Sequence, residues 1–402
     1  MSVDMVLDTQ REYTNISIFL EVNPLTLGSP LHKRRATVTI KALLCKGHAV
    51  IITTSAPRFI FDDLLTTYPQ CTVRNIATLD PGVIQKDPVI VDVEKTMAQL
   101  RSFLDGMNDV ASQEAAWMAE AKLDVVCLDA PFLPARVAKQ VGIPTVMITN
   151  FTFDAVFDAI AKQPSDKELV RRCKDMYNDT QYLIRIPGYI NIPAFDNEMD
   201  QKNVLDVPLI VRKFRQSRVS IREKLDIPLD SHCVLITFGG FELPASAWTA
   251  ENVLPEGWYG IAACPFTDRD VRGRLRRIRA ETWYMPDLIN AVDVVVGKCG
   301  YGTCSEVVAH QVPLVYVPRS GFAEEQGLIE NMMRPYGYAV EMPQQDFYRG
   351  HWTPHILRAR QMKEDHSPPS YIRDDGEAMA SEYIIEIGLQ NAIRNNGPYV
   401  ER

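Results

Sequence analysis

A short glycine-containing loop is the part of this sequence whose residue types and spacing are best suited to chemistry. It reads GKCGYG at 297–302 and stands between an apolar run and a helical pattern. Glycines let a backbone approach a ligand closely, and the start of the next helix offers unpaired N–H groups to an anion. A tight turn that binds nothing is the alternative. The diphosphate site predicted here consists of Lys298, Gly300, Gly302, Thr303 and Ser305.

The elements around this loop form a strand, a helix and a second strand. The apolar runs at 293–296 and 313–317 have the pattern of buried strands, and the segment 303–310 between them is helical. Another strand, helix and strand occupy residues 16–53. Repeated units of this kind predict an α/β fold with parallel sheets. In such sheets ligands bind beyond the carboxyl ends of the strands, which is where the glycine loop stands.

The residues flanking the loop match a known nucleotide-sugar motif. Trp283 opens the motif, and Glu306 follows the glycine loop at the same number of residues as the glutamate of that motif. Glu325-Gln326 stands near its end. The stretch resembles the donor-binding box of family 1 glycosyltransferases, and the chain is also similar to the related family 28 enzymes. It resembles still more the glycosyltransferase-like domain that precedes the kinase in plant L-arabinokinases, through the runs MPDL and GKCGYGT around the loop.

This resemblance implies the GT-B fold, in which two Rossmann-like domains with parallel sheets face each other across a cleft. It also implies roles in donor binding. Trp283 would stack on the base, and Glu306 would hold the ribose hydroxyls. Glu325 and Gln326 would bind the sugar. The turn after the strand at 233–238, with Gly239 and Gly240, would contact the donor phosphates, unless it is a plain βα turn.

The expected co-substrate is a nucleotide sugar carried on uridine diphosphate, with no other cofactor. No Asp-x-Asp motif stands beside the glycine loop. The charge of the leaving group would therefore be met by the helix start, by backbone amides and by Lys298 rather than by a metal. Cys299 and Cys304 have no second Cys/His pair near them, which favours buried thiols over a metal site.

The same resemblance assigns a catalytic pair. His32 stands sixteen residues before His48, in register with the histidine of the family 1 and family 28 enzymes. A histidine titrates near the working pH and suits the general base that deprotonates an acceptor hydroxyl. Asp129, which ends the strand at 124–128, would orient this histidine and stabilise its cation. The alternatives are a solvated polar residue for His32 and a helix or loop cap for Asp129.

The loop before His32 departs from the pattern Gly-His-Gly-x-Gly-His of the arabinokinase-like domains. It reads LGSPLH at 27–32 and keeps only the last histidine, so its backbone must follow a different path. Arg35, one helical turn later, could hold an anion or be a solvated helix charge. Phe151 and Phe153 follow another strand and could line an acceptor pocket, although such aromatic pairs more often belong to a core.

The domain organisation follows from the order of these patterns. The charged run 268–279 is predicted to be a surface helix. After the donor box, a helix is predicted over 325–334, and a polar segment is expected from about 343 to 375. The expected parts are a loose tail over 1–14, an acceptor-side Rossmann-like domain over 15–220, a nucleotide-sugar-binding domain over 221–375, and a helix over 376–402 that crosses back to the first domain.

Composition excludes several classes of function. The 402 residues carry a formal net charge of −8, which argues against a general nucleic-acid binder. No apolar run approaches the roughly 20 residues of a transmembrane helix, and the first residues do not have the pattern of a signal peptide. The eight cysteines are scattered, several within apolar strand patterns. This usage is typical of reduced thiols, so a cytoplasmic location is expected.

These observations predict a glycosyltransferase that moves a sugar from a nucleotide diphosphate donor to a hydroxyl of a small-molecule acceptor. Nucleic acid is not an expected partner. One alternative is a module of the same fold that binds or scaffolds without turnover, which the altered loop at 27–32 favours. Another alternative is a nucleotide-sugar epimerase or hydrolase.

Overall fold

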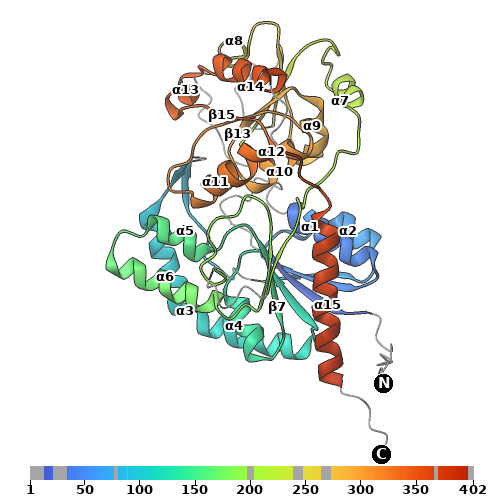
Figure 1. Ribbon diagram of the computed structural model, residues 1–402, viewed down its shortest axis with the longest axis vertical. Coiled ribbons are helices and arrows are strands. Elements are labelled where there is room, and N and C mark those ends of the chain that lie inside the picture. Colours follow the sequence, from blue (N-terminus) through green and yellow to red (C-terminus); the bar gives the residue numbers. More distant parts are fainter. Residues whose placement is uncertain are drawn as a thin grey trace, which may run out of the picture.

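Two α/β domains, one above the other, make up the molecule (Figure 1). The computed structural model describes residues 13–20, 34–76, 80–87, 89–196, 203–238, 248–263, 273–365 and 370–396. His32, Gly239 and Gly240 lie outside the described residues, as does the altered loop at 27–32. The backbone of Arg35 is described, but its side chain is not.

The first domain is built on a parallel sheet with the order β3-β2-β1-β6-β7-β8-β9. Apolar side chains fill both faces of its central strands; all four residues of β6 are buried, for example. Such runs suit parallel strands covered by helices on both sides. The strands are β1 (Asn15–Leu20), β2 (Ala49–Thr54), β3 (Cys71–Asn75), β6 (Val125–Leu128), β7 (Thr145–Thr149), β8 (Tyr182–Arg185) and β9 (Val204–Asp206). The helices are α1 (Arg34–Cys45), α2 (Asp62–Thr67), α3 (Val93–Glu120), α4 (Leu133–Gln140), α5 (Phe153–Ile160) and α6 (Pro164–Tyr177).

The second domain has a parallel sheet with the order β12-β11-β10-β13-β14-β15. Its strands are β10 (Cys233–Thr237), β11 (Tyr259–Ala262), β12 (Leu275–Arg277), β13 (Val294–Gly297), β14 (Leu314–Tyr316) and β15 (Ala339–Glu341). Its helices are α7 (Arg218–Lys224), α8 (Ala250–Val253), α9 (Met285–Ala291), α10 (Tyr301–Ala309), α11 (Ala323–Leu328), α12 (Arg334–Tyr336), α13 (Gln344–Arg349) and α14 (Thr353–Asp365).

Each sheet reverses its strand order at one place, which is where open α/β sheets bind ligands. In the first domain the reversal lies between β1 and β6, which pair in parallel. Asp129 follows β6 at this point. In the second domain the reversal lies between β10 and β13, and the glycine loop follows β13.

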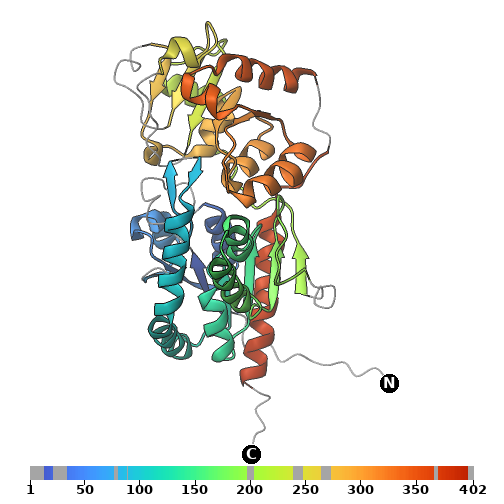
Figure 2. The same cartoon turned by 90° about the vertical axis from the view of Figure 1, so that its left-hand side faces the viewer.

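The carboxyl ends of the two sheets face each other. Asn150, after β7, donates from Nδ2 to Oε1 of Glu324, which follows β14, over 3.2 Å. A hairpin of β4 (Gln85–Asp87) and β5 (Ile90–Val91) rises from the first domain toward the second (Figure 2). Ile90 bridges Ser320, and Val89 is buried in an apolar cluster of the second domain. The loops that follow the strands therefore meet at the domain interface.

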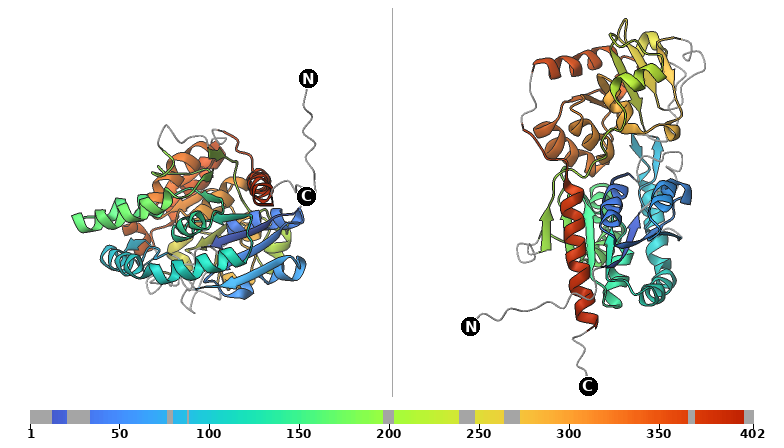
Figure 3. Two further views of the ribbon diagram at one scale, coloured as in Figure 1. Left: turned by 90° about the horizontal axis from the view of Figure 1, so that it is seen from below. Right: turned by 90° about the vertical axis from the view of Figure 1, so that its right-hand side faces the viewer.

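Two segments cross between the domains side by side. The backbone N–H of Leu209 donates to the carbonyl of Arg373, and the N–H of Gly376 donates to the carbonyl of Leu209, each over 3.0 Å. A Cβ atom at residue 376 would clash with the carbonyl oxygen of Pro208, so this crossing needs glycine there. The last helix, α15 (Gly376–Asn396), then packs along the first domain (Figure 3).

Contacts of α15 with the first domain are specific. Asn391 donates to the carbonyl of Asp124 over 3.1 Å, and Gly388 lies against Thr14 and Val125. Tyr383 packs edge-on against Tyr182. The expected domain boundary near residue 220 falls within α7, whose partner is α9 of the second domain.

Three features of the second domain differ from the sequence-based predictions. The charged run 268–279 contains the edge strand β12 rather than a surface helix, because Leu275 is buried and the strand pairs with β11. The segment expected to be polar contains α13 and α14, which bury Phe347 and Ile356. The helix expected at 325–334 is interrupted by a π-helical turn over Ile329–Met333. Among the described residues, no helix is both long enough and apolar enough to cross a membrane.

Candidate functional site

The glycine loop joins β13 to α10 in the second domain. A Cβ atom at Gly297 would clash with the carbonyl oxygen of Thr237 in β10, so the two central strands can approach only with glycine at this position. Cβ atoms at Gly300 and Gly302, in contrast, would meet nothing within 4 Å. Gly300 is the N-cap of α10 in an extended conformation. The start of α10 therefore has open space beside it, as an anion site requires.

Lys298 is part of this loop and is only 5% exposed. Burial and the nearby positive charge of Arg319 lower the pKa of its ammonium group to about 7, against the opposing effect of Glu324 and Glu325. A lysine with such a pKa takes up a proton when an anion binds next to it, because negative charge nearby favours the ammonium form. A bound diphosphate would supply the negative charge that keeps it protonated.

Glu306, on α10, is paired with an arginine from the segment between the domains. Nε of Arg212 donates to Oε1 of Glu306 over 2.8 Å, and Nη2 of Arg212 contacts the same oxygen. Both side chains are less than one-tenth exposed. The carboxylate expected to hold ribose hydroxyls is therefore already bound through one of its two oxygens.

Glu325 is paired even more completely. Its Oε1 accepts from the backbone N–H of Arg319 and its Oε2 accepts from Nε of Arg319, each over 2.7 Å. The same arginine contacts the carbonyl of Cys299 in the glycine loop and stacks on Phe322. Burial raises the pKa of Glu325 although Arg319 acts against this rise. Glu325 thus braces the loop, and the neighbouring Gln326 is exposed.

The remaining predicted donor residues differ in how accessible they are. Trp283 is half-buried and packs against the apolar core, and Thr303 is half-buried in the first turn of α10. Ser305 is buried, and its hydroxyl donates to the carbonyl of Gly302 over 3.2 Å. Thr303 is therefore better placed than Ser305 to offer a hydroxyl to a ligand.

We expect Glu325→Ala to destabilise the protein by about 3–5 kcal/mol, because it leaves the buried Arg319 without its counter-charge. The free energy of unfolding of both proteins, measured in urea, tests this. Glu330→Ala is the matched control, because its partner Arg334 is 69% exposed, and it should change stability by less than about 1 kcal/mol. Equal losses in the two variants would contradict a bracing role for Glu325.

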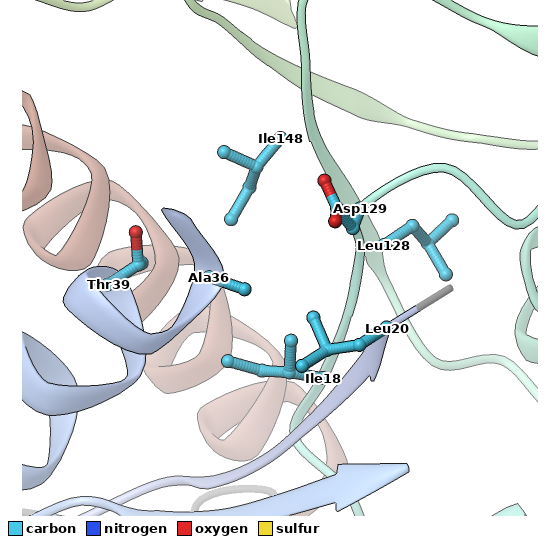
Figure 4. A pocket seen from close by; sticks show the side chains of 7 residues that line it. All are labelled: Ile18, Leu20, Ala36, Thr39, Leu128, Asp129 and Ile148. Atoms are coloured by element: carbon cyan, nitrogen blue, oxygen red, sulfur yellow. The ribbon is translucent and has the colours of Figure 1, made fainter. Parts of the chain in front are cut away.

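On the first domain, a small apolar pocket lies at the reversal of the strand order (Figure 4). Ile18 and Leu20 come from β1, Leu128 ends β6, and Asp129 stands at the margin. The half-buried Asp129 is anchored by its backbone N–H, which donates to the carbonyl of Phe19 over 3.1 Å. The pocket is completed by Ala36, Thr39 and Ile148.

This pocket borders the start of α1, two residues after His32. Thr39 on α1 is 2% exposed, and its hydroxyl has no hydrogen-bond partner among the described residues. Asp129 and the helix that follows His32 therefore flank one pocket. The side chain of His32 itself lies outside the described residues.

The aromatic pair after β7 belongs to the core. Phe153 is 4% exposed and stacks on Phe157, while Phe151 is half-buried and meets Phe153 edge-on. The next residue, Asp154, is buried, and both of its carboxylate oxygens lack a partner among the described residues. Burial raises the pKa of this carboxyl.

Sequence reasoning missed four residues that make polar contacts around the glycine loop or across the domain interface: Asn150, Arg212, Arg319 and Glu324. Arg212 stands in a basic run after an apolar segment, with no local sign of the carboxylate 94 positions later. Arg319 and Glu325 are close in sequence, but the burial that makes their pairing strong is not visible there. Asn150 stands directly before the run from Phe151 to Asp154, and only the aromatic side chains of that run were interpreted as functional.

The two facing α/β domains with parallel sheets have the arrangement of a GT-B protein. Residues 282–332, which span α9 to α11 and include the glycine loop, match the glycosyltransferase family 28 C-terminal domain. The chain is also 32% identical over 339 residues to an L-arabinokinase of Arabidopsis thaliana. That alignment covers 83% of this chain but 31% of the plant protein, so the chain spans about a third of the length of this curated relative.

Solved structures of glycosyltransferases share the fold over nearly the whole chain. A UDP-glucosyltransferase from Polygonum tinctorium has a TM-score of 0.60 at 13% identity, covering 95% of this chain and 100% of that one. The calicheamicin glycosyltransferase CalG4 has a TM-score of 0.59 at 14% identity, with 95% and 100% covered. UGT89C1 of Arabidopsis thaliana, complexed with UDP, has a TM-score of 0.59 at 14% identity, with 93% and 100% covered. These similarities confirm the predicted GT-B fold.

Proposed function

We propose that this protein transfers a sugar from a nucleotide diphosphate donor, with uridine diphosphate as the carrier, to a hydroxyl of a small-molecule acceptor. One observation carries the proposal. The segment that matches the family 28 domain contains a glycine loop with open space beside Gly300 and Gly302, and this loop includes the buried Lys298. The loop stands at the reversal of the strand order, where α/β sheets bind ligands.

Within this proposal, each residue around the loop has its own part of the donor to bind. The start of α10, Thr303 and Lys298 would hold the diphosphate, Trp283 the base and Glu306 the ribose. Gln326 would contact the sugar, and Glu325 would act mainly by bracing the loop through Arg319. The transfer is proposed to be metal-independent, because Lys298 and the helix start supply positive potential where charge develops on the leaving group.

Across the interface, Asp129 and His32 are proposed to activate the acceptor. UGT89C1 has structures with UDP, UDP-L-rhamnose and quercetin, which supports a nucleotide sugar and a small acceptor as the class of ligands. We further propose that the protein works in the cytoplasm, since all seven cysteines within the described ranges are free thiols.

A second candidate is a module that binds a nucleotide sugar without turnover. The loop LGSPLH at 27–32 favours it, because only the last histidine of the pattern in the arabinokinase-like domains is kept. The name of the plant relative suggests a third activity, the phosphorylation of L-arabinose. The transferase and the kinase would give distinct products, and the module would give none.

A panel of nucleotide sugars, incubated with and without small hydroxylated acceptors, separates them. We expect acceptor-dependent release of UDP that persists in a chelator, and Glu306→Ala should weaken UDP binding by about 1–3 kcal/mol in calorimetry. Binding of UDP without release from any sugar nucleotide would favour the module. Formation of a sugar phosphate from ATP and L-arabinose in a parallel assay would instead identify a kinase.

A further inference from the structure

One of the two segments that cross between the domains, residues 207–216, contacts α10 and α9 of the second domain. We call it the crossing segment. The N–H of Ile210 donates to the hydroxyl of Tyr301 in α10 over 3.4 Å. Further along, the N–H groups of Arg215 and Gln216 donate to Oδ1 of Asp287 over 2.5 and 3.0 Å. The backbone is therefore anchored on both sides of Arg212, which fixes where its guanidinium can lie.

The guanidinium of Arg212 has two neighbours. It binds Oε1 of Glu306, as described above, and its central carbon lies 5.0 Å from the ring centre of Tyr284. Arg215 stacks on the same ring, 4.1 Å from its centre. Tyr284 thus lies between the start of α9 and two cations of the crossing segment, and only Arg212 among these cations contacts Glu306.

Both bonds from Arg212 end on Oε1 of Glu306. Within the described part of the chain, no hydrogen bond to Oε2 is found, and the lone pairs of this oxygen remain for a ligand. Hydrogen bonds in which one partner is charged are stronger than those between neutral groups, so an oriented carboxylate oxygen is a good acceptor for a hydroxyl. The guanidinium fixes the carboxylate through one oxygen and leaves the other oxygen open.

We propose that Arg212 is a positioning residue of the donor site: it orients the carboxylate of Glu306 so that Oε2 accepts a hydroxyl of the donor ribose. This role rests on the proposed function of the site. It assigns ribose recognition to a pair from two parts of the chain, the crossing segment and α10. Nucleotides that lack the recognised ribose hydroxyl would gain nothing from the pair.

The experiment compares UDP with 2′-deoxy-UDP and 3′-deoxy-UDP by calorimetry. The wild type should prefer UDP over one of the deoxy analogues by about 10- to 100-fold, the range for a hydrogen bond to a charged group. In Arg212→Gln this preference should fall to within about threefold, with weaker binding of UDP and little change for that analogue. Arg212→Lys retains the charge and should recover part of the preference.

Arg215→Gln is the matched control. It removes a cation from the same tyrosine ring but no hydrogen bond to Glu306, and its backbone anchor on Asp287 does not involve the side chain. This variant should keep the wild-type preference for UDP. In a Glu306→Gln background, Arg212→Gln should add little further loss, because Arg212 acts through the carboxylate.

The outcomes separate the two levels of the proposal. An unchanged preference in both Arg212→Gln and Arg212→Lys would overturn the positioning role and leave the donor site intact. Tighter UDP binding in Arg212→Gln would also overturn it, since the arginine would then be competing with the ribose. Failure of the wild type to bind UDP at all would count against the proposed function itself.

Discussion

Replacing His32 with alanine should lower the rate of sugar transfer by about 10²–10⁴-fold while leaving the affinity for UDP nearly unchanged. This is the usual contribution of a general base, which removes the proton of the acceptor hydroxyl as the bond to the sugar forms. The donor contacts lie on the other domain, so the loss should appear in kcat. Steady-state kinetics and calorimetry on the same preparations measure both quantities.

Asp129 provides the test of how this base is supported. It follows β6 and lines the same pocket as Ala36 and Thr39 of α1, which begins two residues after His32. Asp129→Ala should cost less than His32→Ala, because the imidazole still accepts a proton without its orienting carboxylate. The double variant should be little slower than His32→Ala alone, since Asp129 acts only through the imidazole. Fully additive losses would mean separate roles, and an unchanged rate in His32→Ala would point to a module without this base.

The affinity for UDP should depend on pH through Lys298. Its pKa is about 7 in the ligand-free protein because it is buried beside Arg319. A bound diphosphate raises this pKa by adding negative charge. Binding above pH 7 therefore requires uptake of a proton, and the dissociation constant should rise by up to about tenfold per pH unit until the pKa of the complex is passed. Below pH 7 the lysine is already charged and its contribution is fully present.

Calorimetry of UDP binding between pH 6 and pH 9 checks this expectation. In Lys298→Arg the side chain stays protonated throughout, so the part of the pH dependence above pH 7 that comes from Lys298 should be absent. Any titration of UDP itself affects both proteins equally and drops out when the two profiles are compared. Lys298→Met should bind about 10- to 100-fold more weakly than the wild type at pH 6, the range for losing a charged hydrogen bond, with a flat profile above pH 7. A wild-type profile that matches Lys298→Arg would show that Lys298 does not titrate on binding.

The burial of Lys298 also makes the free energy of unfolding depend on pH. Its pKa in the folded protein lies below the value of roughly 10.4 for an unfolded chain. Between these two values the unfolded chain binds more protons, so this group makes the free energy of unfolding rise with pH from about 7 upward. Nucleotide binding should reduce that dependence, because the diphosphate adds negative charge beside the buried ammonium group and raises its pKa.

The sequence by itself determined the parts of this protein that depend on local patterns. Apolar runs such as 294–296, followed by a glycine loop and a helix, are sufficient to predict β13, α10 and a parallel sheet. Buried strands and helix starts can be recognised from a few adjacent residues, because the apolar pattern of a strand and the capping of a helix are local. The motif around the loop also carried the resemblance that the GT-B fold confirms.

Short and irregular elements were less visible. The edge strand β12 has three residues and two of them are arginines, so its charge pattern favours a surface helix until pairing with β11 overrides it. The hairpin β4–β5 is equally short, and it is held by the burial of Val89 in the other domain. Such elements depend on tertiary contacts more than on their own propensities.

Only the tertiary structure decided how the charged residues of the donor side are paired. Glu306 lies in the predicted motif, but its partner Arg212 comes from the crossing segment, whose path is set by anchors on Tyr301 and Asp287. Glu325 lies at the end of that motif, yet its burial against Arg319 makes it a brace for the loop. Ion pairs form between groups that folding brings together and removes from water, and neither proximity nor desolvation is encoded in the spacing of a motif.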